Sequence, residues 1–249
     1  MKTFVKYILQ KILGFKTYLY IFALFVIVKL RWDKHEKDFF HFLKLLPDEG
    51  IVLDLGANIG VTSYHLAKNN PKNTVFSFEP LEINMEILQR IKKRFRLKNI
   101  REFMVALGNE NTSLEMVMPV INKVPMHGLS HAVHKDITEN NTGLKFEVPM
   151  VRLDDFQELK NTGERITGIK IDVENYEYYV LKGAENLIKK NKPVIYCELW
   201  ENESRKKCFA FLNNLGYSAF ILHKKELVPF TENFHSKNNF FFIPDSLTN

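Results

Sequence analysis

The sequence predicts an α/β protein built on a doubly wound, mostly parallel sheet with helices on both faces. Three observations carry this prediction. Short apolar runs bounded by turn residues alternate with stretches of helical period, as repeated strand–helix–strand units require. A turn that contains two glycines follows the first apolar run, at residues 56–60. The chain of 249 residues, 45% hydrophobic and 26% charged, is long enough for one large domain of this class.

Predicted strands and helices follow one another from residue 51 onward. Each strand is expected where a short apolar run has the composition of a buried strand: 51–55, 74–78, 100–105, 168–172, 193–199, 218–222 and 240–243. Each helix is expected where apolar side chains recur at helical spacing: 61–68, 81–95, 176–190 and 204–215.

Residues 108–150 interrupt this alternation. They contain a polar turn, a methionine-rich run that reads as a strand at 114–120, three histidines and another strand-like run at 145–151. We interpret them as a β-rich antiparallel insertion over the sheet edge, within a domain that spans 47–249. Residues 1–46 form a separate helical segment, which the turn at 47–50 divides from the domain.

The N-terminal segment is basic and amphipathic. Its first helix places Phe4, Val5, Ile8, Ile12 and Phe15 on one face. The longest uncharged run, 17–28, is shorter than the about 20 residues that a membrane-spanning helix needs. No cleavage site for a signal peptide follows it. Three interpretations stay open: the segment lies on an anionic membrane surface, packs on the domain or on a second subunit of a homodimer, or spans the bilayer.

The net charge of +6 belongs to this segment. Residues 1–32 contain six Lys or Arg and no Asp or Glu; 35 basic residues less these six leaves 29, which balance the 29 acidic residues of 33–249. The body of the protein is therefore formally neutral, which argues against a nucleic-acid partner. Cys197 and Cys208 are too few for a disulfide framework. They favour a reducing, cytoplasmic location, with peripheral attachment to the inner face of the membrane as an option.

The turn after the first strand indicates the class of ligand, because doubly wound sheets bind ligands beyond the carboxyl ends of their strands. A dinucleotide fingerprint requires glycines at 56, 58 and 61, but the sequence holds Gly56, Asn58 and Val61. Asp54 and Glu79 end the first two strands, where a carboxylate accepts hydrogen bonds from ribose hydroxyls. This pattern favours S-adenosylmethionine over NAD. The alternative is that both acids are solvated residues at strand ends.

The chain resembles the FkbM-type S-adenosylmethionine-dependent methyltransferases over about residues 48–243. The resemblance rests on five motifs in one order: IVLDLGANIG, VFSFEPLEINMEIL, ALGNE, IKIDVENYEYYVLKGA and PVIYCEL. It implies a Rossmann-like class I methyltransferase fold, with a seven-stranded sheet whose last strand is antiparallel. It also implies O-methylation, often of a sugar or of a natural-product hydroxyl.

The resemblance also implies roles for particular residues. Asp54, Gly56, Asn58 and Gly60 would form the cofactor loop, and Glu79 would bind the ribose. Asn84 would order the loop or helix beside Glu79, and the corner at Ala106 would face the adenine. Asp172 would lie beside the transferred methyl group. One departure is Asn175, which stands where the family usually has glycine; asparagine tolerates a left-handed backbone better than most residues.

An alcohol is a weak nucleophile, so a base at the acceptor is expected. Asp172 is the first candidate, because it ends a central strand at the ligand edge; the alternative is a carboxylate that only contacts the cofactor. His131 is a second candidate, since histidine titrates near neutrality, although a histidine-bearing loop is more often a plain surface loop. We expect Glu174, Glu198 and Trp200 to contact the acceptor. No resident metal is expected, although convergent carboxylates would suit a divalent cation.

Three functions from different classes follow. The first is a methyltransferase that acts on a hydroxyl of a glycan, a glycolipid precursor or a natural product. The second is a non-catalytic protein that binds S-adenosylmethionine or serves as a membrane-associated interaction partner. The third, an NAD-dependent oxidoreductase, is disfavoured by the missing fingerprint glycines.

Overall fold

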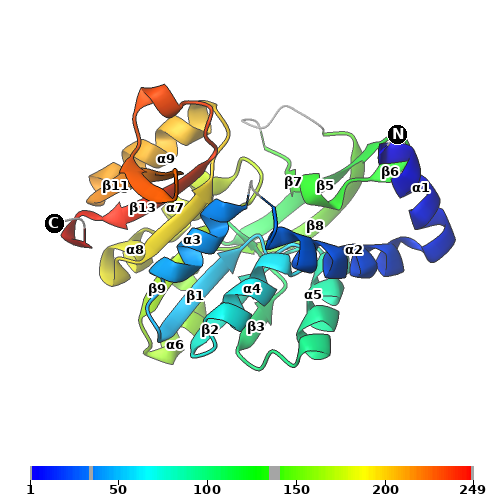
Figure 1. Cartoon of the computed structure of the whole chain (residues 1–249), viewed down its shortest axis with the longest axis horizontal. Coiled ribbons are helices and arrows are strands. Elements are labelled where there is room, and N and C mark those ends of the chain that lie inside the picture. The colour runs from blue at the N-terminus through cyan, green and yellow to red at the C-terminus, as the bar shows by residue number, and fades with distance from the viewer. Residues whose placement is uncertain (1, 34–35, 135–140, 248–249) are drawn as a thin grey trace.

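The computed structural model describes residues 2–33, 36–134 and 141–247. Its main sheet has eight strands in the order β12-β11-β13-β10-β9-β1-β2-β3 (Figure 1). Parallel pairing joins the five strands from β10 to β3, and β13 lies antiparallel between β10 and β11. The strands are β1 (Gly50–Leu55), β2 (Asn73–Phe78), β3 (Ile100–Phe103), β9 (Ile166–Ile171), β10 (Val194–Glu198), β11 (Tyr217–His223), β12 (Glu226–Pro229) and β13 (Asn239–Pro244).

The doubly wound class is confirmed, but the expected seven strands are one too few for the described residues. The additional strand, β12, forms a hairpin with β11 through Lys224 and Lys225, which have φ angles of 47° and 75°. A two-residue turn with both φ angles positive is the hairpin turn that usually contains Asn-Gly. Because a Lys-Lys pair lacks that signature, the sequence predicted no strand at 226–229.

Helices cover both faces of the main sheet, as Figure 1 shows. One face carries α2 (Phe15–Leu30), α3 (Lys37–Leu45), α4 (Val61–Asn69) and α5 (Glu82–Phe95). The other carries α6 (Gln157–Thr162), α7 (Glu177–Gly183), α8 (Glu185–Asn191) and α9 (Glu203–Asn214). Short 3-10 turns lie at His127–Leu129, Leu153–Asp155, Glu232–Phe234 and Asp245–Leu247.

Each face of the sheet has its own hydrophobic core. Ile51, Leu53 and Leu55 of β1 pack with the cluster under α6–α9, whereas Val52 packs with the cluster under α2–α5. This alternation follows from the two-residue period of a strand, which sends successive side chains to opposite faces.

The predicted helix at 176–190 is divided at Ala184 into α7 and α8. A Cβ on Gly183 would lie 1.9 Å from the carbonyl oxygen of Gly108, so the end of α7 touches backbone of another segment. The periodicity of the sequence does not reveal this contact, because it depends on tertiary packing.

The described residues within 106–134 and 141–151 contribute a second, smaller sheet in the order β4-β8-β5-β6, with β7 paired to β5. Its strands are β4 (Ala106–Leu107), β5 (Thr112–Ile121), β6 (Val124–Pro125), β7 (His131–Ala132) and β8 (Gly143–Val151). It packs against the same core as α6–α9.

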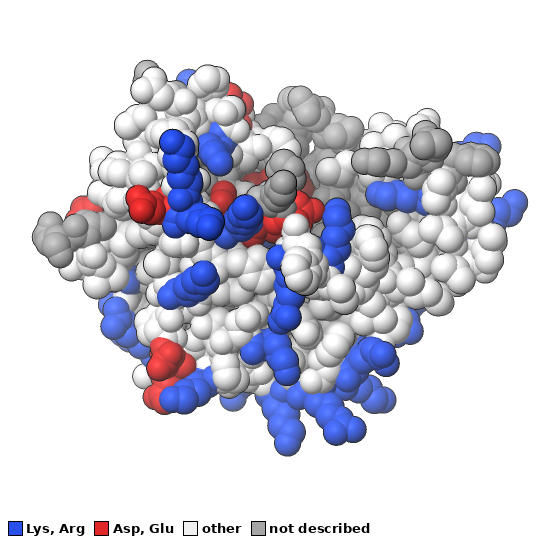
Figure 2. Space-filling view, viewed as in Figure 1, with Lys and Arg blue, Asp and Glu red and all other residues white. Residues whose placement is uncertain are grey.

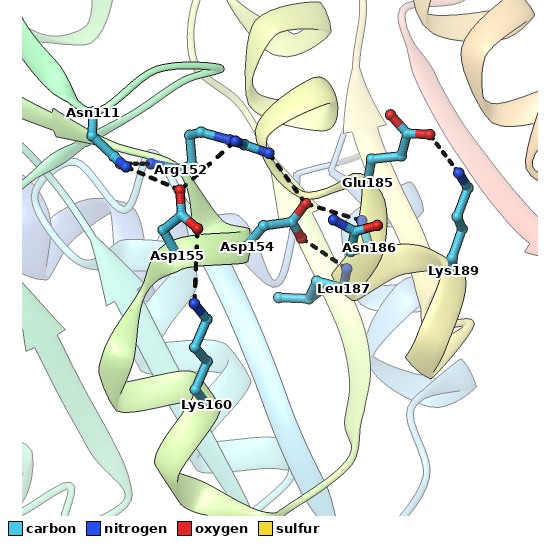
Figure 3. Close-up of polar contacts among 9 residues, drawn as sticks. All are labelled: Asn111, Arg152, Asp154, Asp155, Lys160, Glu185, Asn186, Leu187 and Lys189. Atoms are coloured by element: carbon cyan, nitrogen blue, oxygen red, sulfur yellow. Dashed lines mark hydrogen bonds and ion pairs between the residues drawn. The ribbon is translucent and has the colours of Figure 1, made fainter.

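A polar network fastens this second sheet to α8 (Figure 3). Asp154 follows β8 and accepts hydrogen bonds from the backbone N–H groups of Asn186 (3.0 Å) and Leu187 (2.8 Å). The side chain of Asn111 donates to Asp155 and accepts from the backbone N–H of Arg152. Asp154 therefore satisfies free N–H groups at the start of α8 from outside that helix.

The N-terminal helices α1 (Lys2–Leu13) and α2 lie along one flank of the molecule (Figure 1). Tyr18, Leu19, Ala23 and Ile27 of α2 are buried in the core under α2–α5. Among the described residues no single helix is long and apolar enough to cross a membrane. Helices α1 and α2 are long and apolar enough only when taken together, and a bend of 119° separates them.

Candidate active site

Four predicted site residues meet at one edge of the main sheet. Strands β1, β2, β9 and β10 run parallel, so their carboxyl ends bring Asp54, Glu79, Asp172 and Glu198 to the same edge. Two cavities open there, of about 710 and 1750 Å³. The smaller one lies between the sheet edge and the second sheet, and we call it the cofactor cavity. The larger one extends toward α2, α3 and residues 236–239, and we call it the acceptor cavity.

The loop from Gly56 to Gly60 is tightly built. Gly56 has a φ of 79°, and a Cβ there would lie 1.9 Å from the carbonyl oxygen of Asp172. Gly60, which immediately precedes α4, has a φ of 83° and packs against Leu88 of α5. Asn58 adopts a φ of 48°, which asparagine tolerates better than most residues. The loop backbone therefore approaches both α5 and the end of β9.

Glu79 is buried and held by three donors. Its Oε2 accepts from the backbone N–H of Asn58 at 2.9 Å. Its Oε1 accepts from the backbone N–H of Leu81 and from Nδ2 of Asn84, both at 3.0 Å. Burial raises the pKa of the carboxyl to about 7, although these hydrogen bonds lower it. Asn84 thus orients the Glu79 carboxylate.

The cofactor cavity fits the adenosine part of S-adenosylmethionine by the chemistry of its lining. Glu79 and Asn58 supply polar groups for ribose hydroxyls. The apolar wall, which suits a purine ring, consists of Phe78, Val105, Ala106, Leu107, Leu114 and Met116. Ala106, which the resemblance assigns to the adenine, is part of this wall.

A buried lysine joins the two acids that end β1 and β9. Nζ of Lys170 lies 3.3 Å from Oδ1 of Asp54 and 3.7 Å from Oδ2 of Asp172, and it donates to the carbonyl of Gly56 at 3.0 Å. Burial opposes the charge, yet the neighbouring carboxylates raise the pKa of Lys170. Oδ2 of Asp54 accepts from the hydroxyls of Thr62 and Ser63. Asp54 consequently contacts Lys170 and the start of α4, and it does not line either cavity.

Sequence reasoning missed Lys170, although a signal was present. It is the one charged residue in the apolar run of β9, two residues before Asp172 and so on the same face of the strand. It also pairs in register with Asp54 across β1 and β9. A lone lysine in a buried strand requires an anionic partner.

Asp172 lies where the two cavities meet. Both cavities are lined by Gly56, Asn58, His127 and Asp172. The Asp172 side chain is 40% exposed, whereas its ion-pair partner Lys170 is 4% exposed. The Asp172 carboxylate therefore borders both cavities.

The acceptor cavity is rich in carboxyl groups. Glu36, Asp38, Asp172 and Glu198 line it, with Lys170 among them. Burial raises the pKa of Glu36, Asp38 and Glu198, and the negative charge of Asp172 adds to the rise at Glu36 and Glu198. Figure 2 shows Asp and Glu side chains gathered near the centre of the view, beside α3. Glu36 and Asp38 come from the N-terminal segment and were not among the predicted site residues.

Asn175 adopts a left-handed backbone in the turn after Asp172. Glu174 and Asn175 have φ angles of 51° and 70°, in the left-handed region. Oε1 of Glu177 accepts from the backbone N–H of Asn175 at 3.0 Å, and Oδ1 of Asn175 accepts from Nδ2 of Asn202 at 2.7 Å. Burial raises the pKa of Glu174 and of Glu177 to about 8. Glu174 lines the cofactor cavity rather than the acceptor cavity.

Among the predicted catalytic and acceptor-contacting residues, two lie outside both cavities. His131 is buried in β7, with Nδ1 2.9 Å from the carbonyl of Leu129 and Nε2 3.2 Å from Oδ1 of Asn141. The histidine that lines both cavities is His127, whose pKa burial lowers to about 4. Trp200 is 48% exposed and lines neither cavity. His131 belongs to the short insertion strand β7, whereas Trp200 lies between β10 and α9.

A family model described as the methyltransferase FkbM domain matches residues 54–219. This match runs from the end of β1 to the start of β11 and includes Glu79, Asp172 and Glu198 at the sheet edge. It leaves out α1, α2, α3 and residues 236–239, which complete the acceptor cavity.

Relatives and solved structures agree with this match. The chain is 26% identical over 153 residues to Methyltransferase 1 of Beauveria bassiana, covering 56% of this chain and 60% of that protein. It is 25% identical over 194 residues to Methyltransferase sdnD of Sordaria araneosa, covering 69% and 75%. The crystal structure of methyltransferase FkbM from Methylobacillus flagellatus superposes with a TM-score of 0.50 at 19% identity, covering 78% of this chain and 44% of that one. The chain thus spans less than two thirds of the Beauveria relative, and the structural likeness concerns the fold.

Proposed function

Because the chain belongs to the FkbM methyltransferase family, whose cofactor is S-adenosylmethionine, we propose that it transfers a methyl group to a hydroxyl of a glycan, glycolipid precursor or natural product. The observation that carries this proposal is the meeting of two cavities at Asp172. One cavity suits an adenosine and the other has room for a larger acceptor. Two separate sites that share one carboxylate are what a two-substrate transfer requires.

The residues of this chain have distinct tasks in that reaction. Glu79, held by the backbone N–H of Asn58, would accept hydrogen bonds from the ribose, and Gly56 lets the loop backbone lie close against the carbonyl of Asp172. S-adenosylmethionine supplies an electrophilic methyl group on a sulfonium, together with its leaving group. Asp172 accepts the proton of the acceptor hydroxyl on its carboxylate and releases it to solvent, to which it is exposed. Lys170 holds Asp172 in place.

The acceptor cavity favours a substrate that carries many hydroxyl groups. Carboxyl groups whose pKa is raised offer a donor when protonated and acceptors in either state, which suits sugar hydroxyls. Asn238 and Asn239 add amide groups to the same wall. A strongly anionic acceptor would face Glu36, Asp38 and Glu198 and is disfavoured.

The experiment is a methyl-transfer screen with purified protein and methyl-labelled S-adenosylmethionine. The panel contains free saccharides, nucleotide sugars, lipid-linked saccharides and hydroxylated natural products. Formation of a methyl ether that falls about 100-fold or more in Asp172→Asn, with S-adenosylhomocysteine affinity unchanged within a few fold, supports both the reaction and the base. Methylation of nitrogen or carboxyl oxygen contradicts the O-methylation proposal. Tight cofactor binding without turnover on any acceptor favours the non-catalytic function.

The two cysteines are buried and free, which supports a location in a reducing compartment, the cytoplasm.

A further inference from the structure

Helix α1 presents its apolar face to solvent. Val5, Ile8, Leu9 and Ile12 recur at helical spacing and are all exposed, Ile12 to 74%. The opposite side of α1 carries Lys6, which lies over the ring of Phe22 of α2. An amphipathic helix on a globular domain normally buries its apolar face, so α1 is inverted.

Helix α2 extends this apolar surface. One side is buried in the domain, while Ile21, Phe25 and Val28 point outward at a spacing of four and three residues, followed by Trp32. Phe25, Val28 and Trp32 are 60%, 65% and 82% exposed. We call the exposed apolar residues of α1 and α2, with Trp32, the N-terminal apolar surface. Contiguous apolar surface of this kind marks a binding face.

All charged side chains within residues 1–32 of the N-terminal segment are basic. Residues 1–32 contain Lys2, Lys6, Lys11, Lys16, Lys29 and Arg31 and no acidic residue. Glu86 and Asp33 pair with Lys16 and Lys29, and no ion pair is found for Lys11 or Arg31 within the described parts of the chain. On the right of Figure 2, over α1 and the start of α2, white and blue atoms cover the described residues.

We propose that the N-terminal apolar surface binds the surface of an anionic phospholipid bilayer, with α1 and α2 lying in the plane of the interface. Apolar side chains enter the acyl boundary while lysine and arginine contact the anionic headgroups. This proposal does not depend on the methyl-transfer function.

Two other occupants fit the observations less well. A second copy of the chain would bring two basic surfaces together across a two-fold axis, which like charges oppose. A transmembrane span would require lipid around α2, but Leu19 and Ala23 are fully buried in the protein. Helices of 12 and 16 residues extend about 18 and 24 Å, less than the roughly 30 Å hydrocarbon thickness.

Membrane binding would place the acceptor cavity close to lipid. Val26 and Leu30 line that cavity from α2, the helix whose outer side exposes Phe25 and Val28. An acceptor with a lipid anchor would then reach the cavity while its anchor stays in the bilayer.

The test measures sedimentation of the full chain with vesicles of phosphatidylcholine alone, or of equal parts phosphatidylcholine and phosphatidylglycerol. The variants are Leu9→Ser with Ile12→Ser on α1, and Phe25→Ser with Val28→Ser on α2. Because these side chains are exposed, the fold should persist, which S-adenosylhomocysteine binding verifies on the same samples. Leu247→Ser, which also removes an exposed leucine, is the matched control.

We expect binding to the anionic vesicles that weakens roughly tenfold in each double variant and is unchanged in the control. The pair Lys11→Gln and Arg31→Gln should weaken it roughly fivefold per charge, and added salt should do the same. Failure of the full chain to bind, or binding that all variants retain, overturns the proposal. The proposal is also overturned if the full chain does not bind vesicles but forms a dimer in light scattering that the apolar variants dissociate. That result would assign the N-terminal apolar surface to a second copy of the chain.

Discussion

Glu79 accepts three hydrogen bonds from the protein while remaining in the wall of the cofactor cavity. Replacing it with alanine removes the ribose acceptor, so Glu79→Ala should weaken S-adenosylhomocysteine binding roughly 10- to 100-fold in a calorimetric titration. Glu82→Ala, an exposed acid three residues along, is the control and should bind normally. NAD should not bind to either protein. Unchanged affinity in Glu79→Ala would place the ribose elsewhere.

Gly56 is fixed by both its backbone angle and its neighbours. A side chain at this position has to adopt a positive φ and clashes with the carbonyl of Asp172. Gly56→Ala should therefore lower the free energy of unfolding by about 2 to 3 kcal/mol in urea titrations and weaken cofactor binding. Gly128→Ala has open space and no positive φ, so its stability should stay close to that of the parent protein. Equal stability of the two variants would mean that the loop is less constrained than its geometry indicates.

At the scale of elements, the second sheet and α8 are joined through Asp154 (Figure 3). Its side chain is 5% exposed and also lies 3.6 Å from Arg152. Asp154→Ala leaves two helix N–H groups without an acceptor and should cost about 2 kcal/mol of unfolding free energy. Asp154→Asn, which keeps one acceptor oxygen, should lose less. The exposed Glu164→Ala should show no change, and a similar loss in both would point to a general charge effect.

Contacts between elements also position the wall of the acceptor cavity that contains Asn238. Arg205 of α9 donates to the carbonyls of Leu199, Trp200 and His235 and to the side chain of Asn238. It therefore ties the segment after β10 to the loop before β13, and Asn238 in that loop lines the cavity. An arginine buried among backbone carbonyls has a positioning role that helical periodicity alone does not indicate.

For the whole molecule, burial of carboxyl groups at the site predicts how stability depends on pH. The pKa values of Glu79, at about 7, and of Glu174 and Glu177, at about 8, lie above the ordinary value of 4.5. Between these values the folded protein holds protons that the unfolded chain has released. Raising the pH through this range therefore favours unfolding.

Two buried histidines act in the opposite direction at lower pH. Burial lowers the pKa of His65 and His127 from 6.5 to about 4. Between these two values the histidines bind protons in the unfolded chain but not in the folded protein. Above pH 6.5 the histidine effect fades as the unfolded chain loses these protons, and the carboxyl effect dominates. The melting temperature of the cofactor-free protein should thus fall between pH 6.5 and 8. Glu177→Gln, which cannot ionise but keeps its acceptor oxygen, should flatten this fall, whereas the exposed Glu158→Gln should not. A melting temperature that rises over this range would contradict the assignment.

The doubly wound core, the turn from Gly56 to Gly60 and the two acids Asp54 and Glu79 could be predicted from the order of residues alone. These features are local: strand and helix periods, turn residues and positions at strand ends are set by neighbours along the chain. Three features became visible only in the folded molecule: Lys170 bridges Asp54 and Asp172, His127 rather than His131 lines the cavities, and Glu36 and Asp38 reach the acceptor cavity. Tertiary packing also decided which side of α1 faces solvent. Each of these depends on packing between segments far apart in sequence, where the free energy of burial and pairing outweighs any local preference.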